Sequence, residues 1–277
     1  MTHELNEMQL MMLDMMKWFH SFCQENNIKY FVIGGTMLGA VRHQGFIPWD
    51  DDIDVGIPRK DYERLIREKK SLFGGEKRYI FESYHDGKRD FIYAYAKIYD
   101  THTTLVENCR HHAKRGIFID VFPLDGIGSS REDAYKNFLP IKRRVNFLMT
   151  RTCELRKSRK LVKNIAIVLS RLLPGFLFDN HKFIAKINYL CSERDFESSV
   201  FVGNLFGNWG KKEIMPKSYF GKPTLYKFED MYVYGPEDYD NYLRNVYNNW
   251  CQLPPIEEQK SHHDFLFMDL HQHYLEL

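Results

Sequence analysis

A cluster of four aspartates, Asp50, Asp51, Asp52 and Asp54, is the feature that most limits how this chain folds. Side chains alternate between the faces of a strand, so Asp52 and Asp54 point the same way, and Asp50 joins them if the strand begins early. The flanking Trp, Ile and Val residues indicate partial burial, where crowded carboxylates repel one another unless a cation lies between them. An all-oxygen ligand set favours Mg²⁺ or Mn²⁺ over zinc. The alternative is a solvated acidic turn.

A further aspartate, Asp120, lies in the apolar segment 116–121, which is predicted to be a strand. A lone charge is costly to bury there. If this strand lies beside that of Asp52 and Asp54, three carboxylates form one site. Such a site can hold two metal ions that act on the attacking and leaving oxygens of a displacement. Asp125, close behind, is predicted to form a turn.

Gly34 and Gly35 end an apolar strand predicted at 30–33, and Thr36 is expected to cap the helix that follows. Glycine lets a backbone approach a ligand closely, and a helix N-terminus binds phosphate. The position of this Gly-Gly pair before the aspartate cluster makes it a candidate phosphate-binding turn.

Composition narrows the class of protein. The 277 residues are 44% hydrophobic and 27% charged, as in ordinary globular proteins. A net charge of +2 excludes a uniformly basic nucleic-acid coat, and no nucleic-acid partner is expected. Five scattered cysteines indicate free thiols in a reducing compartment. With neither an export signal nor a long apolar run, we expect a cytoplasmic location.

Periodicity predicts an α/β (α+β) chain. Helices are predicted at 4–27, 36–41, 61–73 and about 236–248, and strands at 30–33, 53–57, 79–83, 93–99, 116–121, 224–228 and 231–234. Residues 131–195 are mostly helical in pattern, with an interruption at Pro174-Gly175. Because there is no repeat and no flexible linker, we expect a single domain over residues 1–277 with a helical insertion at about 131–195.

Two blocks, GGTMLGAVRHQGFIPWDDDIDVGI and GIFIDVFPLDG, together resemble the LicD family of bacterial phosphocholine transferases. That family is related to fukutin and the fukutin-related protein, within the nucleotidyltransferase superfamily, and the segment FEDMYVYGPEDYDNYLRNVYNNWCQLPP is also similar to its tail. The resemblance implies a small mixed sheet flanked by helices. It also implies transfer of phosphocholine from CDP-choline to a sugar hydroxyl, with release of CMP. The acceptor would be a cell-surface glycan precursor of teichoic acid or lipopolysaccharide type.

The same resemblance assigns roles to residues. Asp52 and Asp54 would bind Mg²⁺ or Mn²⁺, Asp50 would be a further ligand, and Asp120 would bind metal or take the proton of the acceptor hydroxyl. The candidates on the substrate side are the turn Gly34, Gly35 and Thr36, the diphosphate neighbours Arg42, His43 and Lys97, and the aromatic Trp49. Aromatic faces attract the quaternary ammonium of choline. The candidates for such a cage are Trp49, Tyr84, Tyr93, Tyr95 and Trp209.

Some alternatives stay open at this point. The carboxylates would equally serve a nucleotidyltransferase that moves NMP from an NTP, or remain as relics in a non-catalytic scaffold. Cys109 and the histidines near it fit no usual zinc spacing. His262 and His263 suit either the active site or the surface. The basic and then apolar region 142–182 is typical of a helix on the anionic inner face of the plasma membrane, where a lipid-linked acceptor would lie, or of a helix packed on the domain.

Overall fold

The computed structural model describes residues 5–76, 78–110, 112–155, 160–172, 179–261, 263 and 265–274. Its central sheet is mixed, as expected, because β2 and β7 are parallel while the other neighbours are antiparallel. The strands run in the order β1-β2-β7-β4-β3, and β8 extends the sheet from β7 to β9. Their bounds are β1 Phe31–Val32, β2 Asp54–Pro58, β3 Tyr79–Glu82, β4 Ala96–Asp100, β7 Phe118–Gly128, β8 Phe201–Asn204 and β9 Ile214–Pro216.

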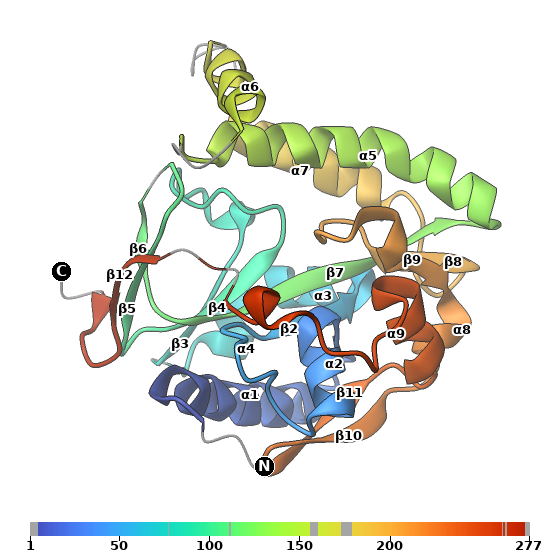
Figure 1. Ribbon diagram of the computed structural model, residues 1–277, viewed down its shortest axis with the longest axis horizontal. Coiled ribbons are helices and arrows are strands. Elements are labelled where there is room, and N and C mark those ends of the chain that lie inside the picture. The colour runs from blue at the N-terminus through green and yellow to red at the C-terminus, as the bar shows by residue number, and fades with distance from the viewer. Residues whose placement is uncertain are drawn as a thin grey trace.

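Helices cover the sheet on both sides. They are α1 Glu7–Glu25, α2 Gly34–Arg42, α3 Arg59–Arg67, α4 Lys69–Phe73, α5 Arg131–Thr152, α6 Leu161–Arg171, α7 Asn180–Ser192, α8 Lys217–Phe220 and α9 Tyr239–Tyr247. Figure 1 shows α5 and α7 side by side, α6 above one end of them, and α1 on the opposite side of the sheet. A continuous cluster of buried apolar side chains links α1, the sheet, α5 and α7. The α+β class predicted from periodicity is therefore confirmed.

Two smaller sheets complete the fold. The hairpin of β10 (Thr224–Phe228) and β11 (Met231–Gly235) has nearly the predicted bounds. In the other, β5 (Thr104–Glu107) pairs with β6 (Lys114–Arg115) and with β12 (Phe265–Asp269), near the end of the chain. This last pairing brings Ser261 and His263 close to the loop that precedes β2.

The first predicted helix is present as α1. Its cap, Asn6, accepts a hydrogen bond from the backbone N–H of Gln9, and the Gln9 side chain accepts one from the backbone N–H of Asn6. This reciprocal capping satisfies two N–H groups that the helix leaves without partners. The Met and Phe stripe of α1 is buried in the core, as packing of an amphipathic helix requires.

The strand predicted at 116–121 is longer than expected, and the turn predicted at Asp125 is wrong. β7 continues through Pro123 to Gly128. Pro123 has no N–H to donate, but on that edge β4 stops pairing at Val121 and β8 begins at Leu124. The proline falls in the gap between two partners, so the strand tolerates it.

Other boundaries differ by a few residues. The strand predicted from Tyr93 begins at Ala96, and α2 begins at Gly34, so Thr36 lies inside the helix and does not cap it. Some residues on which predictions were made lie outside the described residues, namely His111 near Cys109, Arg156, Lys157 and Arg159 in the basic region 142–182, Pro174-Gly175, and His262.

Candidate active site

Strand register places Asp54, Asp120 and Lys97 in one row across the sheet. Asp54 on β2 is the parallel partner of Asp120 on β7, and Lys97 on β4 is the antiparallel partner of Asp120. Directly paired residues have their side chains on the same face. The two segments that carry aspartates, about 65 residues apart in the chain, are thus adjacent in space.

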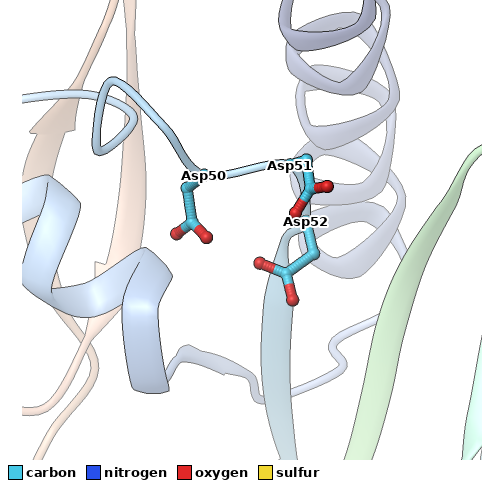
Figure 2. A group of neighbouring side chains, drawn as sticks. All are labelled: Asp50, Asp51 and Asp52. Carbon is cyan, nitrogen blue, oxygen red and sulfur yellow. The ribbon is translucent and has the colours of Figure 1, made fainter. Parts of the chain in front are cut away.

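Asp50, Asp51 and Asp52 lie in the loop before β2, as Figure 2 shows. One oxygen from each lies within 4.8 Å of the others. The strand does not extend back to Asp50, but a hydrogen bond joins the Asp50 and Asp52 side chains. The loop therefore brings Asp50 beside Asp52 without strand alternation.

Two glycines make room for two of these carboxylates. A Cβ on Gly34 would lie 3.0 Å from Oδ2 of Asp54, and one on Gly35 would lie 2.8 Å from Oδ2 of Asp50. Gly34 also has a φ of +56°, a conformation that other residues rarely adopt. The Gly-Gly pair therefore lets the start of α2 pack directly against the aspartates.

Hydrogen bonds secure this packing. The Thr36 hydroxyl accepts a bond of 2.9 Å from the backbone N–H of Asp54, and the Gly34 N–H donates over 3.0 Å to the hydroxyl of Tyr242 on α9. The predicted phosphate-binding turn thus lies beside the aspartates, with the Gly34 N–H already engaged by a side chain.

The buried carboxylates disfavour one another's charge. Burial, together with Asp52, Asp120 and Asp50, raises the pKa of Asp54 well above its usual value. Burial and the neighbouring Asp52 raise the pKa of Asp50 to about 8. A divalent cation between these oxygens would reverse the effect, because it stabilises the ionised forms. The oxygen-only donor set and the glycine gap beside it fit Mg²⁺ or Mn²⁺.

Lys97 is enclosed with Asp120. Only 1% of its side chain is exposed, and its Nζ lies 2.9 Å from Oδ1 of Asp120 and 3.7 Å from Oε2 of Glu107. Burial alone would lower the pKa of Lys97, but these carboxylates outweigh it and raise that pKa. Burial raises the pKa of Asp120 to about 6, although Lys97 opposes the rise. The charge of Lys97 is therefore directed at Asp120.

A cavity of about 370 Å³ lies beside Asp52, Asp54 and Asp120. Its acidic lining consists of Asp52, Asp54, Asp120, Glu107 and Glu213. Its aromatic lining consists of Tyr93, Tyr95, Phe122, Phe206 and Trp209, and α5 contributes Val145, Leu148, Met149 and Thr152. A cavity with carboxylates and an aromatic wall suits a ligand that carries both a metal-bound phosphate and a cation.

Several predicted site residues do not line this cavity. Arg42 ends α2 at the opposite terminus from the glycines, and its guanidinium donates to the backbone oxygen of Trp250 and to His43. Trp49 lies 6.4 Å from His43, measured between ring centroids. Tyr84 lines a separate pocket. Of the five proposed cage residues, Tyr93, Tyr95 and Trp209 are brought together.

The C-terminal segment reaches the aspartate loop. His263 Nδ1 lies 2.8 Å from Oδ1 of Asp51, and the hydroxyl of Ser261 donates to the other oxygen of Asp51. Although burial opposes the change, Asp51 and Asp52 raise the pKa of His263 to about 9. The sequence left open whether His263 lies at the active site or on the surface. In the structure it lies beside Asp51 and lines the cavity. The pairing of β12 with β5 puts it there.

Glu213, Glu107 and Tyr242 are site residues that sequence reasoning missed. Glu107 ends a short strand, β5, that was not predicted. Glu213 ends the 3-10 helix η2 (Gly210–Glu213), between β8 and β9. In the sequence, Glu213 stands in the run GNWGKKEIMP, directly before two apolar residues. No pattern in that run indicates that Glu213 lies near the aspartates of β2 and β7.

Known proteins of one family are similar to this chain. Residues 27–155 match the family described as LicD/FKTN/FKRP, nucleotidyltransferase domain. The chain is 32% identical over 264 residues to the lipopolysaccharide cholinephosphotransferase LicD of Haemophilus influenzae, covering 94% of this chain and 96% of that protein. A segment of 63 residues is 35% identical to the ribitol 5-phosphate transferase FKRP of mouse and human, covering 22% of this chain and 13% of each relative.

Proposed function

The chain belongs to the LicD/FKTN/FKRP family and is a phosphotransferase, and we propose that it moves phosphocholine from CDP-choline to a sugar hydroxyl. The acceptor would be a cell-surface glycan precursor of lipopolysaccharide or teichoic acid type. The observation that carries the proposal is the row of paired carboxylates, Asp54 beside Asp120, in a cavity that also has aromatic lining. Near full-length similarity to a lipopolysaccharide cholinephosphotransferase supports it.

In the proposed reaction, the acceptor hydroxyl oxygen attacks the phosphorus that carries choline. The bond from that phosphorus to the CMP oxygen breaks, and CMP leaves with the bonding electrons. Such transfers depend on positioning and on neutralisation of charge. Asp50, Asp52, Asp54 and Asp120 would hold Mg²⁺ or Mn²⁺, which when bound neutralises charge on the diphosphate. Lys97 holds the Asp120 carboxylate in place from the side of β4.

The aromatic lining is the proposed site of the choline group. The Tyr93 and Tyr95 rings lie 5.5 Å apart between centroids, and Trp209 lines the same cavity. Aromatic faces attract quaternary ammonium ions, most strongly where water is excluded. Glu107, which also lines the cavity, accepts a hydrogen bond from the Tyr93 hydroxyl and adds negative charge beside these rings.

A thermal-shift panel tests the donor. CDP-choline, CDP-ethanolamine, CDP-ribitol, CTP and ATP are each added with and without Mg²⁺. A ligand at 100 times its Kd adds roughly 2.7 kcal/mol, which is about 5–10 °C in Tm for a chain of this size. We expect the largest metal-dependent shift with CDP-choline, and release of CMP when lipopolysaccharide is present. A preference for CTP or ATP with release of pyrophosphate would instead identify a nucleotidyltransferase.

We also propose that the protein works at the anionic inner face of the plasma membrane, through α6. The large apolar side chains exposed on and next to this helix are Leu161, Val162, Ile165, Val168, Leu169 and Leu172. Residues 155–178 contain six Lys or Arg and no Asp or Glu. An exposed apolar face with basic neighbours binds the surface of anionic membranes. Because α5 both packs on α6 and lines the cavity, a lipid-linked acceptor would reach the cavity from that side.

A further inference from the structure

Glu213 is a buried carboxylate that the reaction described above does not use. It lies in η2, between β8 and β9, and 8% of the residue is exposed. It lines the same cavity as Asp54 and Asp120 but comes from a different wall, since those two aspartates belong to β2 and β7. It also lies outside residues 27–155, which match the family model.

The chain around Glu213 holds its carboxylate in a fixed position. The backbone N–H of Trp209 donates to Oε1 over 2.9 Å, and the Asn204 side chain provides a second hydrogen bond. Gly207 packs so closely that a Cβ there would lie 1.9 Å from Oε1. A carboxylate held in this way is positioned for proton transfer, because its orientation does not have to be found during the reaction.

The charges that face Glu213 come from three elements. Lys142 approaches from α5, but its Nζ donates to the backbone oxygen of Gly207, and no Lys or Arg nitrogen of the described residues lies within 4.0 Å of the Glu213 carboxylate. Asp54 on β2 and the hydroxyls of Tyr242 and Tyr247 on α9 are its other titratable neighbours. Burial raises the pKa of Glu213 to about 7, although the Trp209 N–H, Lys142 and Asn204 oppose the rise.

Asp120 is less suited to accept a proton. One of its oxygens lies against the Lys97 ammonium, and its register partner is Asp54, so both aspartates face the proposed metal position. A carboxylate that binds a cation is a weaker base, because the cation stabilises its ionised form. Glu213 lines the same cavity but has neither the Lys97 ammonium against it nor an aspartate as its strand partner.

We propose that Glu213 is the catalytic base that takes the proton from the acceptor hydroxyl. As the oxygen of that hydroxyl forms its bond to phosphorus and the bond to CMP breaks, the proton moves to the Glu213 carboxylate and then to water. This inference rests on the proposed transferase function. It adds a residue to the reaction from a part of the chain beyond the aspartate motifs.

The test is the pH profile of Glu213→Gln, measured as release of CMP from CDP-choline with Mg²⁺ and lipopolysaccharide. In the wild-type protein, kcat/KM should fall below about pH 7 as Glu213 becomes protonated. Glu213→Gln, which still accepts the Trp209 hydrogen bond, should lower kcat by about 100- to 10,000-fold and remove that fall. The Tm shift with CDP-choline and Mg²⁺ should stay as in the wild type.

Two further variants separate a base from a structural residue. Glu213→Asp keeps a carboxylate, so it should retain the fall below pH 7 at a lower rate. Glu132→Gln, at an exposed position in the first turn of α5, should match the wild type. Wild-type kcat in Glu213→Gln, or an unchanged pH profile in that variant, would overturn the inference. A wild-type protein that releases no CMP from any CDP-alcohol of the panel would overturn the transferase function together with it.

Discussion

Asp120 and Asp125 lie on the same buried strand, β7, but their neighbouring side chains differ. Asp125 accepts two hydrogen bonds of 2.7 Å from the Arg59 guanidinium, so both of its oxygens are engaged. Asp120 has the Lys97 ammonium on one side and Asp54 on the other. A fully paired carboxylate is structural, whereas one left between a cation and other carboxylates is available to a metal ion.

At this scale, Asp54→Asn should remove turnover and leave the fold intact. The amide has nearly the shape of the carboxylate but neither its charge nor its affinity for Mg²⁺, so we expect the release of CMP to fall by about 100-fold or more. The Tm of the metal-free protein should rise, because Asp54 no longer repels Asp52 and Asp120, and the Tm shift with Mg²⁺ should shrink. Asp230→Asn, at a surface ion pair with Lys17, is the control. Normal turnover in purified Asp54→Asn would disprove the metal assignment.

At the scale of elements, a buried polar network joins β7, α3 and α7. Arg59 pairs with Asp125 and donates over 3.1 Å to the Asn188 side chain, which in turn donates to the backbone oxygen of Ala94. The helix held by this network, α7, packs beside α5, which lines the cavity.

Arg59→Met should therefore be strongly destabilising. It leaves the Asp125 carboxylate buried without a partner, and such losses are about 3–5 kcal/mol in the free energy of unfolding. Lys60→Met, on the same helix, removes an exposed ion pair with Asp195 and should change that free energy by less than about 1 kcal/mol. Urea denaturation measures both. Equal effects from the two substitutions would show that the network contributes little.

At the scale of the whole molecule, α6 packs on α5, which is also the helix that lines the cavity. The only buried residues of α6 are Ile167 and Ser170, and its other apolar side chains face outward. No helix among the described residues is both long and apolar enough to cross a bilayer. The two helices α5 and α6 of the region 142–182 thus differ. The apolar face of α5 packs on the protein, whereas most apolar side chains of α6 are exposed.

Co-sedimentation with vesicles containing phosphatidylglycerol tests the membrane proposal. The wild-type protein should bind at low salt and bind less at high salt, because part of the attraction is electrostatic. Val162→Glu combined with Leu169→Glu should weaken binding by about tenfold or more, since apolar area is lost and negative charge is added. Ile256→Glu, at an exposed apolar position in η3 (Ile256–Glu258), is the control. Equal binding by the α6 variant and the wild type would exclude α6 as the contact.

The sequence alone determined the elements whose signals are local. The apolar stripe of α1, the strand that begins near Asp54 and the α+β class all follow from patterns within one segment. The motifs at 34–57 and 116–126 were enough to indicate the family. Only the tertiary structure decided which distant residues meet. The pairing of Lys97 with Asp120, the approach of His263 to Asp51 and the entry of Glu213 into the cavity depend on contacts between remote segments, because strand register and the packing of loops are set by the whole core and leave no local pattern.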